Sequence, residues 1–493
     1  MELISKTMLM GGADKNDTFF ISSITDTDNN NQFNNYRYFG HGLYQKNDGG
    51  YIVLTNYDKT TGANDAWSPT FIEYNSNGDV IKAMRFDWPG TADIQTASRA
   101  CGNFLYDEAT KYIFFVTQYS TSKLILACLD WNTDTIVWQK DIGQTQGTSA
   151  YIDVFQAADS DYIMLWGLYH SHATTGNNDR TFAAKWKKDG TASSQKQSSH
   201  SQYSGQTVCL SPDGTRLYYG TGTDTTTVQT QYFSYFNTDS GDETFTEYPC
   251  FQANQQYRNL DGSAMAMDET LIHIVCQNYA TQGQLLYTPV NWSTETLAGE
   301  DRRFTSSIVN TGNTVPPEFD YPWVRVDSGG KVYVAYSRYK NESGFANEYS
   351  IGILKFNTDG TILWHRGLRY PMTAAGDSSA YYVKNLEITK RDNIMLHFGA
   401  TYLNATASAT LEHSCLAVLP SDGSLTGTYG PFVWESIYDP TVSNHNSTIS
   451  NSTTSRLTGA GITPQPETST VTANDITNAI NFPNIDLTLN KLQ

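Results

Sequence analysis

Two histidines and an aspartate in one polar segment have the spacing that best fits metal chemistry. His170 and His172 lie two positions apart, so an extended backbone directs both to one side, and Asp179 could approach across the loop. Imidazole and carboxylate groups are zinc ligands. The spacing fixes no third ligand, however, and an ordinary polar loop explains the same residues. We therefore expect no metal and no cofactor.

Four long polar segments are the best candidates for a binding surface. They are YDKTTGANDAW (57–67), YHSHATTGNNDR (169–180), SRYKNESGFANEY (337–349) and TYLNATASATLEH (401–413). Aromatic rings offer apolar contact area while amides hydrogen-bond hydroxyls, so this composition suits a sugar or a protein surface. Solvated loops without a ligand are the alternative. The candidate binding residues are Trp67, Tyr169, Arg180, Arg338, Tyr339 and Tyr402.

Signatures of catalysis are missing from the sequence. It contains no G-x-S-x-G, no H-E-x-x-H and no Gly-rich phosphate loop between a strand and a helix. No acid/base pair can be selected among the many Asp and Glu residues. We therefore name no catalytic residue, and the sequence favours a binding or structural protein over an enzyme.

The composition excludes several classes of partner. The 493 residues include 32 Lys plus Arg against 50 Asp plus Glu, a formal net charge of -18 that disfavours nucleic acid. The longest nearly uninterrupted apolar stretch, YIMLWGLY (162–169), is far shorter than the roughly 20 residues that span a bilayer.

The start, MELISKTMLMGG, is too short and too weakly apolar for a secretory signal. Six dispersed Cys are expected to be buried free thiols.

A β-hairpin pattern recurs along the chain. In ILKFNTDGTILW (353–364), apolar-alternating runs flank an Asp-Gly turn, the residue pair that supplies positive φ angles. Similar turns at Gly78, Asp134, Gly190, Gly241, Thr294, Gly360 and Gly423 are spaced by 56, 56, 51, 53, 66 and 63 residues, and a second hairpin precedes each. The sequence thus predicts seven four-stranded units.

Such units bury both faces when they are stacked radially, which is the β-propeller arrangement. The runs SPDGTRLYY and FNTDGTILW are similar to blade motifs of several propeller families. We predict an all-β chain: a single seven-bladed β-propeller over residues 36–434, an N-terminal leader over 1–35 and an extended Asn/Ser/Thr-rich arm over 435–493. In such blades the long loops lie on one face and the tight turns on the other, and binding is usually placed on long loops.

We make separate predictions for the two ends of the chain. FFISSITD (19–26) could add to the last blade and close the ring, or be merely a first edge strand. The arm beyond Trp434 has few aromatics and several Pro, so it should build no core of its own. We expect it to be extended and buried mainly by other chains. TANDITNAI (472–480) is expected to form one helical turn.

The opening ISKTMLMGG, a short apolar leader followed by Gly-Gly, is similar to the leader of virion structural proteins from tailed bacteriophages, particularly marine ones. The resemblance implies a tail or capsid-surface protein, assembled in the bacterial cytoplasm and carried on the virion in several symmetric copies. Its termini would bind other virion proteins, and its propeller would mediate assembly or contact a host-surface glycan. A propeller-fold carbohydrate-active enzyme, a glycosidase or lyase, is the alternative, followed by a non-viral adhesin or scaffold.

Overall fold

The computed structural model describes most of the strands and tight turns of the chain. The described residues are 18–26, 42–58, 67–87, 99–100, 102–119, 123–144, 150–157, 159–171, 178–198, 203–222, 231–237, 248–251, 263–278, 283–306, 319–340, 348–371, 378–404, 409–429, 432–445, 457–458, 465–466, 472–475, 480–481 and 484–486. Their regular elements are all β-strands, which confirms the predicted all-β class. This part of the chain holds no helix long and apolar enough to cross a membrane.

The strands form seven antiparallel sheets, which we number in chain order. Sheet 1 contains β2 (Leu43–Gln45), β3 (Tyr51–Asp58), β4 (Trp67–Tyr74) and β5 (Val80–Asp87). Sheet 2 contains β6 (Arg99–Ala100), β7 (Leu105–Asp107), β8 (Tyr112–Tyr119), β9 (Lys123–Asp130) and β10 (Thr135–Gln144). Sheet 3 contains β11 (Ala150–Gln156), β12 (Tyr162–Ser171), β13 (Asn178–Lys187) and β14 (Ala192–Ser198).

The remaining four sheets repeat this order. Sheet 4 contains β15 (Tyr203–Leu210), β16 (Arg216–Gly222), β17 (Gln231–Asn237) and β18 (Tyr248–Phe251). Sheet 5 contains β19 (Ser263–Met267), β20 (Leu271–Asn278), β21 (Gln284–Asn291), β22 (Thr296–Leu297) and β23 (Asp301–Thr305). Sheet 6 contains β24 (Asp320–Val326), β25 (Val332–Lys340), β26 (Glu348–Phe356) and β27 (Ile362–Arg369). Sheet 7 contains β28 (Ser378–Ile388), β29 (Ile394–Asn404), β30 (Ala409–Leu419) and β1 (Phe20–Asp26).

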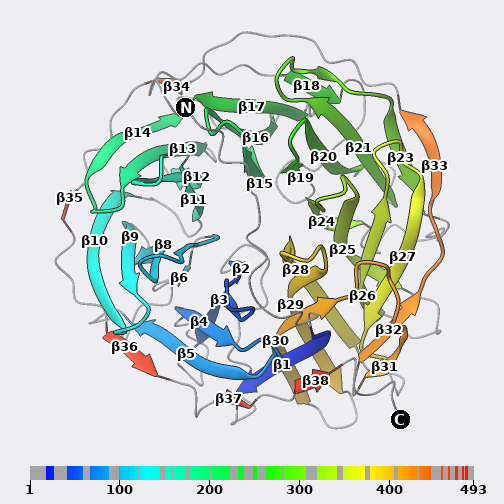
Figure 1. The fold of residues 1–493 in the computed structure, drawn as a ribbon, viewed down its shortest axis with the longest axis horizontal. Coiled ribbons are helices and arrows are strands. Elements are labelled where there is room, and N and C mark those ends of the chain that lie inside the picture. Colours follow the sequence, from blue (N-terminus) through cyan, green and yellow to red (C-terminus); the bar gives the residue numbers. More distant parts are fainter. Residues whose placement is uncertain are drawn as a thin grey trace.

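The sheets lie one after another around a common centre, with the first strand of each innermost (Figure 1). Each sheet contacts the next in chain order, and β28 of sheet 7 contacts β2 of sheet 1. Apolar side chains fill the gaps between neighbouring sheets: Leu126 and Trp186, for example, belong to one buried cluster between sheets 2 and 3. A sheet that contributes to two such clusters, one with each neighbour, is therefore buried on both of its faces.

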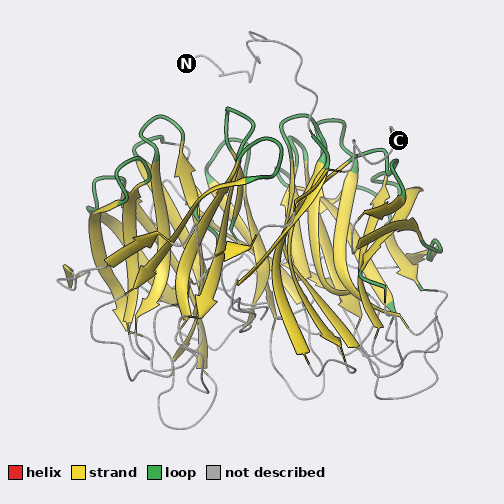
Figure 2. Cartoon of the chain, turned by 90° about the horizontal axis from the view of Figure 1, so that it is seen from below, coloured by secondary structure: helices red, strands yellow, loops and turns green. Residues whose placement is uncertain are grey.

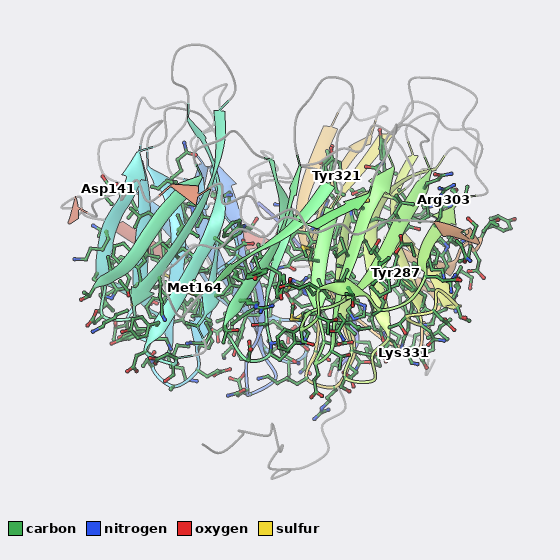
Figure 3. The ribbon with its side chains drawn as sticks, turned by 90° about the horizontal axis from the view of Figure 1, so that it is seen from above. Asp141, Met164, Tyr287, Arg303, Tyr321 and Lys331 are labelled. Atoms are coloured by element: carbon green, nitrogen blue, oxygen red, sulfur yellow. The ribbon has the colours of Figure 1, made fainter. Side chains whose placement is uncertain are left out.

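The tight hairpin turns gather at one end of the sheets, which we call the turn face (Figure 2). The residues at which we predicted turns adopt positive φ in five cases: Gly78, Asp134, Gly190, Gly360 and Gly423. At the Thr294 turn the positive φ belongs to its neighbour Glu295, and Gly241 lies outside the described residues. Lys331, labelled in Figure 3, marks the turn face in sheet 6, and we call the opposite ends of the sheets the loop face.

Strand β1 is added to the outer edge of sheet 7, one of the two arrangements that the sequence left open for residues 19–26. It pairs with β30 over five residues, from Phe20 opposite Val418 to Ile24 opposite Ser414. Phe20 and Ile24 are fully buried and share a cluster with Tyr51 and Val53 of sheet 1. The N-terminal strand therefore joins sheet 7 by hydrogen bonds and sheet 1 by apolar contact.

One contact recurs between neighbouring sheets. A bulky side chain on the outer strand of one sheet covers the positive-φ glycine in the turn of the next, where an added Cβ would lie 2.4 to 2.9 Å from it. The pairs are Phe20 with Gly78, Trp138 with Gly190, Arg302 with Gly360, and Trp364 with Gly423. Both Trp indoles also donate a hydrogen bond of 3.0 Å to a carbonyl of that turn. Here glycine is required for its conformation and for this close approach.

The C-terminal arm adds short strands to the outer edges of the sheets in reverse order, as the orange-to-red segments of Figure 1 show. It begins in sheet 6, where β31 (Gly427–Tyr429) and β32 (Phe432–Ser436) form a hairpin and β32 pairs with β27. The later pairs are β33 (Thr441–His445) with β23, β34 (Leu457–Thr458) with β14, β35 (Gln465–Pro466) with β10, β36 (Thr472–Asp475) with β5, and β37 (Ile480–Asn481) and β38 (Asn484–Asp486) with β1.

Part of this path differs from the helical turn that the sequence predicted for residues 472–480. Residues 472–475 form a strand that pairs with β5, so the predicted helical turn does not include them, and residues 476–479 lie outside the described residues. The described strands of the arm pair with outer strands of the same chain, and the expectation that other chains bury the arm stays a prediction. The start of the arm is anchored, since Trp434 just before it is fully buried and its indole donates to the Ser424 carbonyl over 3.0 Å.

Replacing Phe20 with Ala should destabilise the fold by about 3–5 kcal/mol, because a fully buried aromatic ring is removed from the contact between sheets 7 and 1. Chemical denaturation followed by tryptophan fluorescence measures the change. Leu363→Ala is the control: its side chain is 45% exposed on an outer strand, so the change should stay within about 0.5 kcal/mol. Equal effects of the two substitutions would contradict a special role for Phe20.

Candidate functional site

The candidate binding residues lie near the loop-face ends of four sheets. Trp67 opens β4 of sheet 1, Tyr169 and Arg180 are opposite each other on β12 and β13 of sheet 3, and Tyr402 is near the end of β29 in sheet 7. Arg338 and Tyr339 are near the end of β25 in sheet 6. The segments that we expected to form binding loops, 59–66, 172–177, 341–347 and 405–408, lie outside the described residues.

Arg338 is an interior residue, which corrects its assignment to a surface site. Its side chain is 1% exposed. Val334 and Tyr336 pack against sheet 5, and the period of two along β25 places Arg338 on the same side. A single sequence does not reveal which face of a strand a neighbouring sheet will cover, so this burial was missed. The other five candidates are described by their backbone alone.

Beside Arg338 lies a buried histidine that holds the first part of the arm. His365 Nδ1 donates to the carbonyl of Tyr438 over 2.7 Å, so its Nε2 is the nitrogen that accepts from the Tyr336 hydroxyl. Burial, with smaller contributions from the charges of Arg338 and Arg366, lowers the pKa of His365 to about 3. A neutral imidazole is therefore the form that this hydrogen-bond pattern requires.

A second, partly buried histidine contacts the strand that completes sheet 7. His413 Nδ1 lies 2.7 Å from the Ser23 hydroxyl of β1, and burial lowers the pKa of His413 to about 4. His273, His365 and His397 are buried, whereas His41 lies outside the described residues. These histidines have structural partners.

The possible metal ligands are only partly brought together. His170 and Asp179 are opposite each other in the β12–β13 register, but His172 lies outside the described residues. No cluster of three His, Cys, Asp or Glu side chains suited to a metal occurs in the part of the chain that the structure describes. Cys128, Cys209, Cys276 and Cys415 are free thiols, three of them buried.

A cavity at the turn-face ends of the innermost strands was not predicted. It has a volume of about 310 Å³, and its wall comes from sheets 1, 2, 3 and 7. Polar lining residues are Gln45, Asn103, Gln156, Glu387 and Lys390; Phe104, Phe155 and several aliphatic side chains supply the apolar wall. We call it the axial cavity.

Each of the three amide side chains uses one of its two polar ends in a hydrogen bond to the backbone. Gln45 Oε1 accepts from the Lys390 backbone N–H over 2.7 Å. Asn103 Oδ1 accepts from the Phe104 N–H over 2.9 Å. Gln156 Nε2 donates to the Tyr162 carbonyl over 3.0 Å. These bonds fix which end of each amide is oxygen and which is nitrogen. Gln45 and Gln156 end the first strand of their sheets just before the turn, a recurrence that aligning the repeats would have revealed.

Comparison with known proteins yields only distant structural likenesses. No family model matches the chain, and no curated protein matches it. A mutant of AofleA from Arthrobotrys oligospora is 10% identical, covering 67% of this chain and 88% of that one, with a TM-score of 0.37. NanB sialidase from Streptococcus pneumoniae is 12% identical over 85% and 72% of the two chains, with a TM-score of 0.37. A Dyadobacter fermentans protein of unknown function is 8% identical over 82% and 100%, with a TM-score of 0.40. Likenesses this distant assign neither an activity nor a ligand.

Acidification should weaken the fold through His365 and His413. Their pKa is lowered from 6.5 to about 3 and about 4, so below pH 6.5 the unfolded chain takes up protons that the folded chain does not. Their contribution to stability is present at neutral pH, falls as the pH drops below 6.5, and is lost fully near pH 3.

The variant His365→Gln isolates this effect from the carboxylates that titrate in the same range. The difference in unfolding free energy between the wild type and this variant should shrink between pH 7 and pH 4, because only the wild type loses stability through this side chain. Urea denaturation at each pH measures it. A difference that stays constant would contradict the assignment, and His413→Asn provides an independent repeat.

Proposed function

We propose that the chain is a closed seven-bladed β-propeller that serves as a non-catalytic structural and attachment protein of a phage virion. Each of the seven sheets would be one blade, with β1 as the outer strand of the last. Phe20 supports closure, since it makes the same contact with the turn glycine of sheet 1 that Trp138 and Trp364 make with the sheets that follow theirs. The virion assignment rests on the leader ISKTMLMGG and its resemblance to tailed-phage structural proteins.

The observation that carries the attachment role is the common placement of Trp67, Tyr169, Arg180, Tyr339 and Tyr402. All five belong to strand ends at the loop face, opposite the tight turns. A frame whose strands are paired on both sides holds such positions in a fixed arrangement. The face would contact a host-surface glycan or a neighbouring virion protein. Single sugar contacts are weak, but repeated copies on one particle would raise avidity by roughly 10²–10⁴.

Replacing Tyr339 and Tyr402 with Ala together should lower particle adsorption by at least about tenfold, because the loss at each site is multiplied over the copies on a particle. Adsorption to host cells and the amount of subunit in purified particles are measured side by side. Tyr438→Ala is the matched control, since that ring is 74% exposed and only its carbonyl is used within the fold. Loss of incorporation instead would indicate an assembly contact, and no change in either would reject this face.

Removing residues 447–493 should leave a folded chain that is no longer incorporated into particles. The cut retains β32 and β33, whose pairing with sheets 6 and 5 belongs to the packed part of the arm. It removes the strands that cover the outer edges of β1, β5, β10 and β14, so the purified variant should also self-associate more readily. Normal incorporation would contradict a role for the distal arm in assembly.

A further inference from the structure

The axial cavity has the features of a site for a small uncharged ligand. Its volume of about 310 Å³ lies at the lower end of the range for small-molecule sites. Four sheets contribute to its wall, so it is framed by the most rigid elements of the fold. It lies at the turn face, away from the strand ends that carry Tyr339 and Tyr402.

The anchored amides leave a defined set of hydrogen-bonding groups. Because Gln45 and Asn103 use their oxygens within the protein, their NH₂ groups remain as donors. Because Gln156 uses its nitrogen, its carbonyl oxygen remains as an acceptor. No protein partner for these three groups occurs among the described residues. Two donors and one acceptor, each held in orientation by the backbone of a neighbouring turn or strand, match a pair of hydroxyl groups, which both accept and donate.

The two charged residues of the wall already have side-chain partners. Glu387 accepts hydrogen bonds from Arg325 Nε at 2.9 Å and Nη2 at 2.6 Å. Lys390 Nζ donates to Asn47 Oδ1, and Asp48 and Glu108 lie near enough to act on it electrostatically. The wall therefore offers no unpaired carboxylate to attract a cation, the Lys390 ammonium already donates within the protein, and Phe104 and Phe155 add apolar surface.

We propose that the axial cavity binds a small neutral polyhydroxylated ligand, one unit of a neutral sugar, with Gln45 and Asn103 donating to its oxygens and Gln156 accepting from a hydroxyl. Ring C–H groups of the ligand pack on the aromatic wall. This is a second site on the face opposite to the one in the proposed function, and it does not depend on that function. A free sugar and the end of a saccharide chain would present the same chemistry.

Binding is tested with the full chain, using the methyl glycosides of glucose, galactose and N-acetylglucosamine, with glucuronic acid and glucosamine as charged counterparts. Saturation-transfer NMR detects contact and calorimetry measures Kd. At least one neutral glycoside should bind with a Kd in the millimolar range, as expected for a single sugar contact, and the charged sugars should bind more weakly. A trisaccharide of the preferred sugar that binds as well as the glycoside identifies a chain end as the natural source, whereas weaker binding identifies the free sugar.

Isosteric substitutions separate the ligand contacts from the fold. Gln45→Glu and Asn103→Asp each keep the oxygen that accepts from the backbone but lose the NH₂ donor, and each should weaken binding about tenfold, the effect of one lost hydrogen bond. Asn132→Asp, the same charge change in an exposed turn, should leave Kd unchanged. Two variants are used so that misfolding of one, seen as a lowered melting temperature, leaves the other decisive.

Three results would overturn the assignment. These are no binding of any neutral glycoside at concentrations well above the millimolar range, unchanged Kd in both isosteric variants, or stronger binding of a charged sugar. Binding lost in the Tyr339 and Tyr402 double variant but kept in Gln45→Glu would place the sugar on the loop face, so the axial site would fail while the proposed attachment role would stand. Binding lost only in the cavity variants supports the axial site whatever the adsorption result.

Discussion

The contact between sheet 7 and sheet 1 is the constraint on which the other contacts depend. Each sheet covers a face of the next, so the first and last sheets would each leave a face open to water unless they meet. The N-terminal strand β1 supplies that meeting, because Phe20 and Ile24 are buried against sheet 1 while the backbone of β1 pairs with β30. Residues 20–24 and 414–418, which are far apart in the sequence, thereby become neighbours. The described cysteines are free, so this contact rests on apolar packing and strand pairing.

The repeat made much of this architecture predictable. Asp-Gly turns followed by alternating apolar runs locate the hairpins, and Gly78, Gly190, Gly360 and Gly423 have the positive φ that such turns require. For FFISSITD the sequence left two arrangements open, and β1 adopts the one in which it pairs with sheet 7. The arm's path did not follow, because its strands of two to five residues carry no apolar alternation of their own. They are specified by the outer edges with which they pair.

The candidate site was less predictable than the fold, for a physical reason. Sequence composition identifies which loops are long and aromatic, but it does not say which side of a strand a neighbouring sheet covers. Arg338 was grouped with Tyr339 on composition, yet the alternation of β25 places it in the interior near His365. The axial cavity was missed because its amides come from separate repeats. Gln45 and Gln156 line the same cavity because the first strands of their sheets converge at the centre.

The outer edges of the sheets show how such a fold avoids pairing with other chains. An open edge strand is a template for association, and β-bulges are one way to disrupt it. Ile81, Val137 and Leu363 are each skipped in the pairing register of their outer strands, and each is roughly half exposed near the turn face. The arm pairs with the same strands only beyond these bulges, at 84–87, 140–141 and 366–369. In these three outer strands, bulges therefore interrupt the part of the edge next to the turns, and the arm covers the part next to the loops. Together, the bulges and the arm leave little regular edge of these strands exposed. A partner that binds to these edges through backbone pairing would first have to displace the arm.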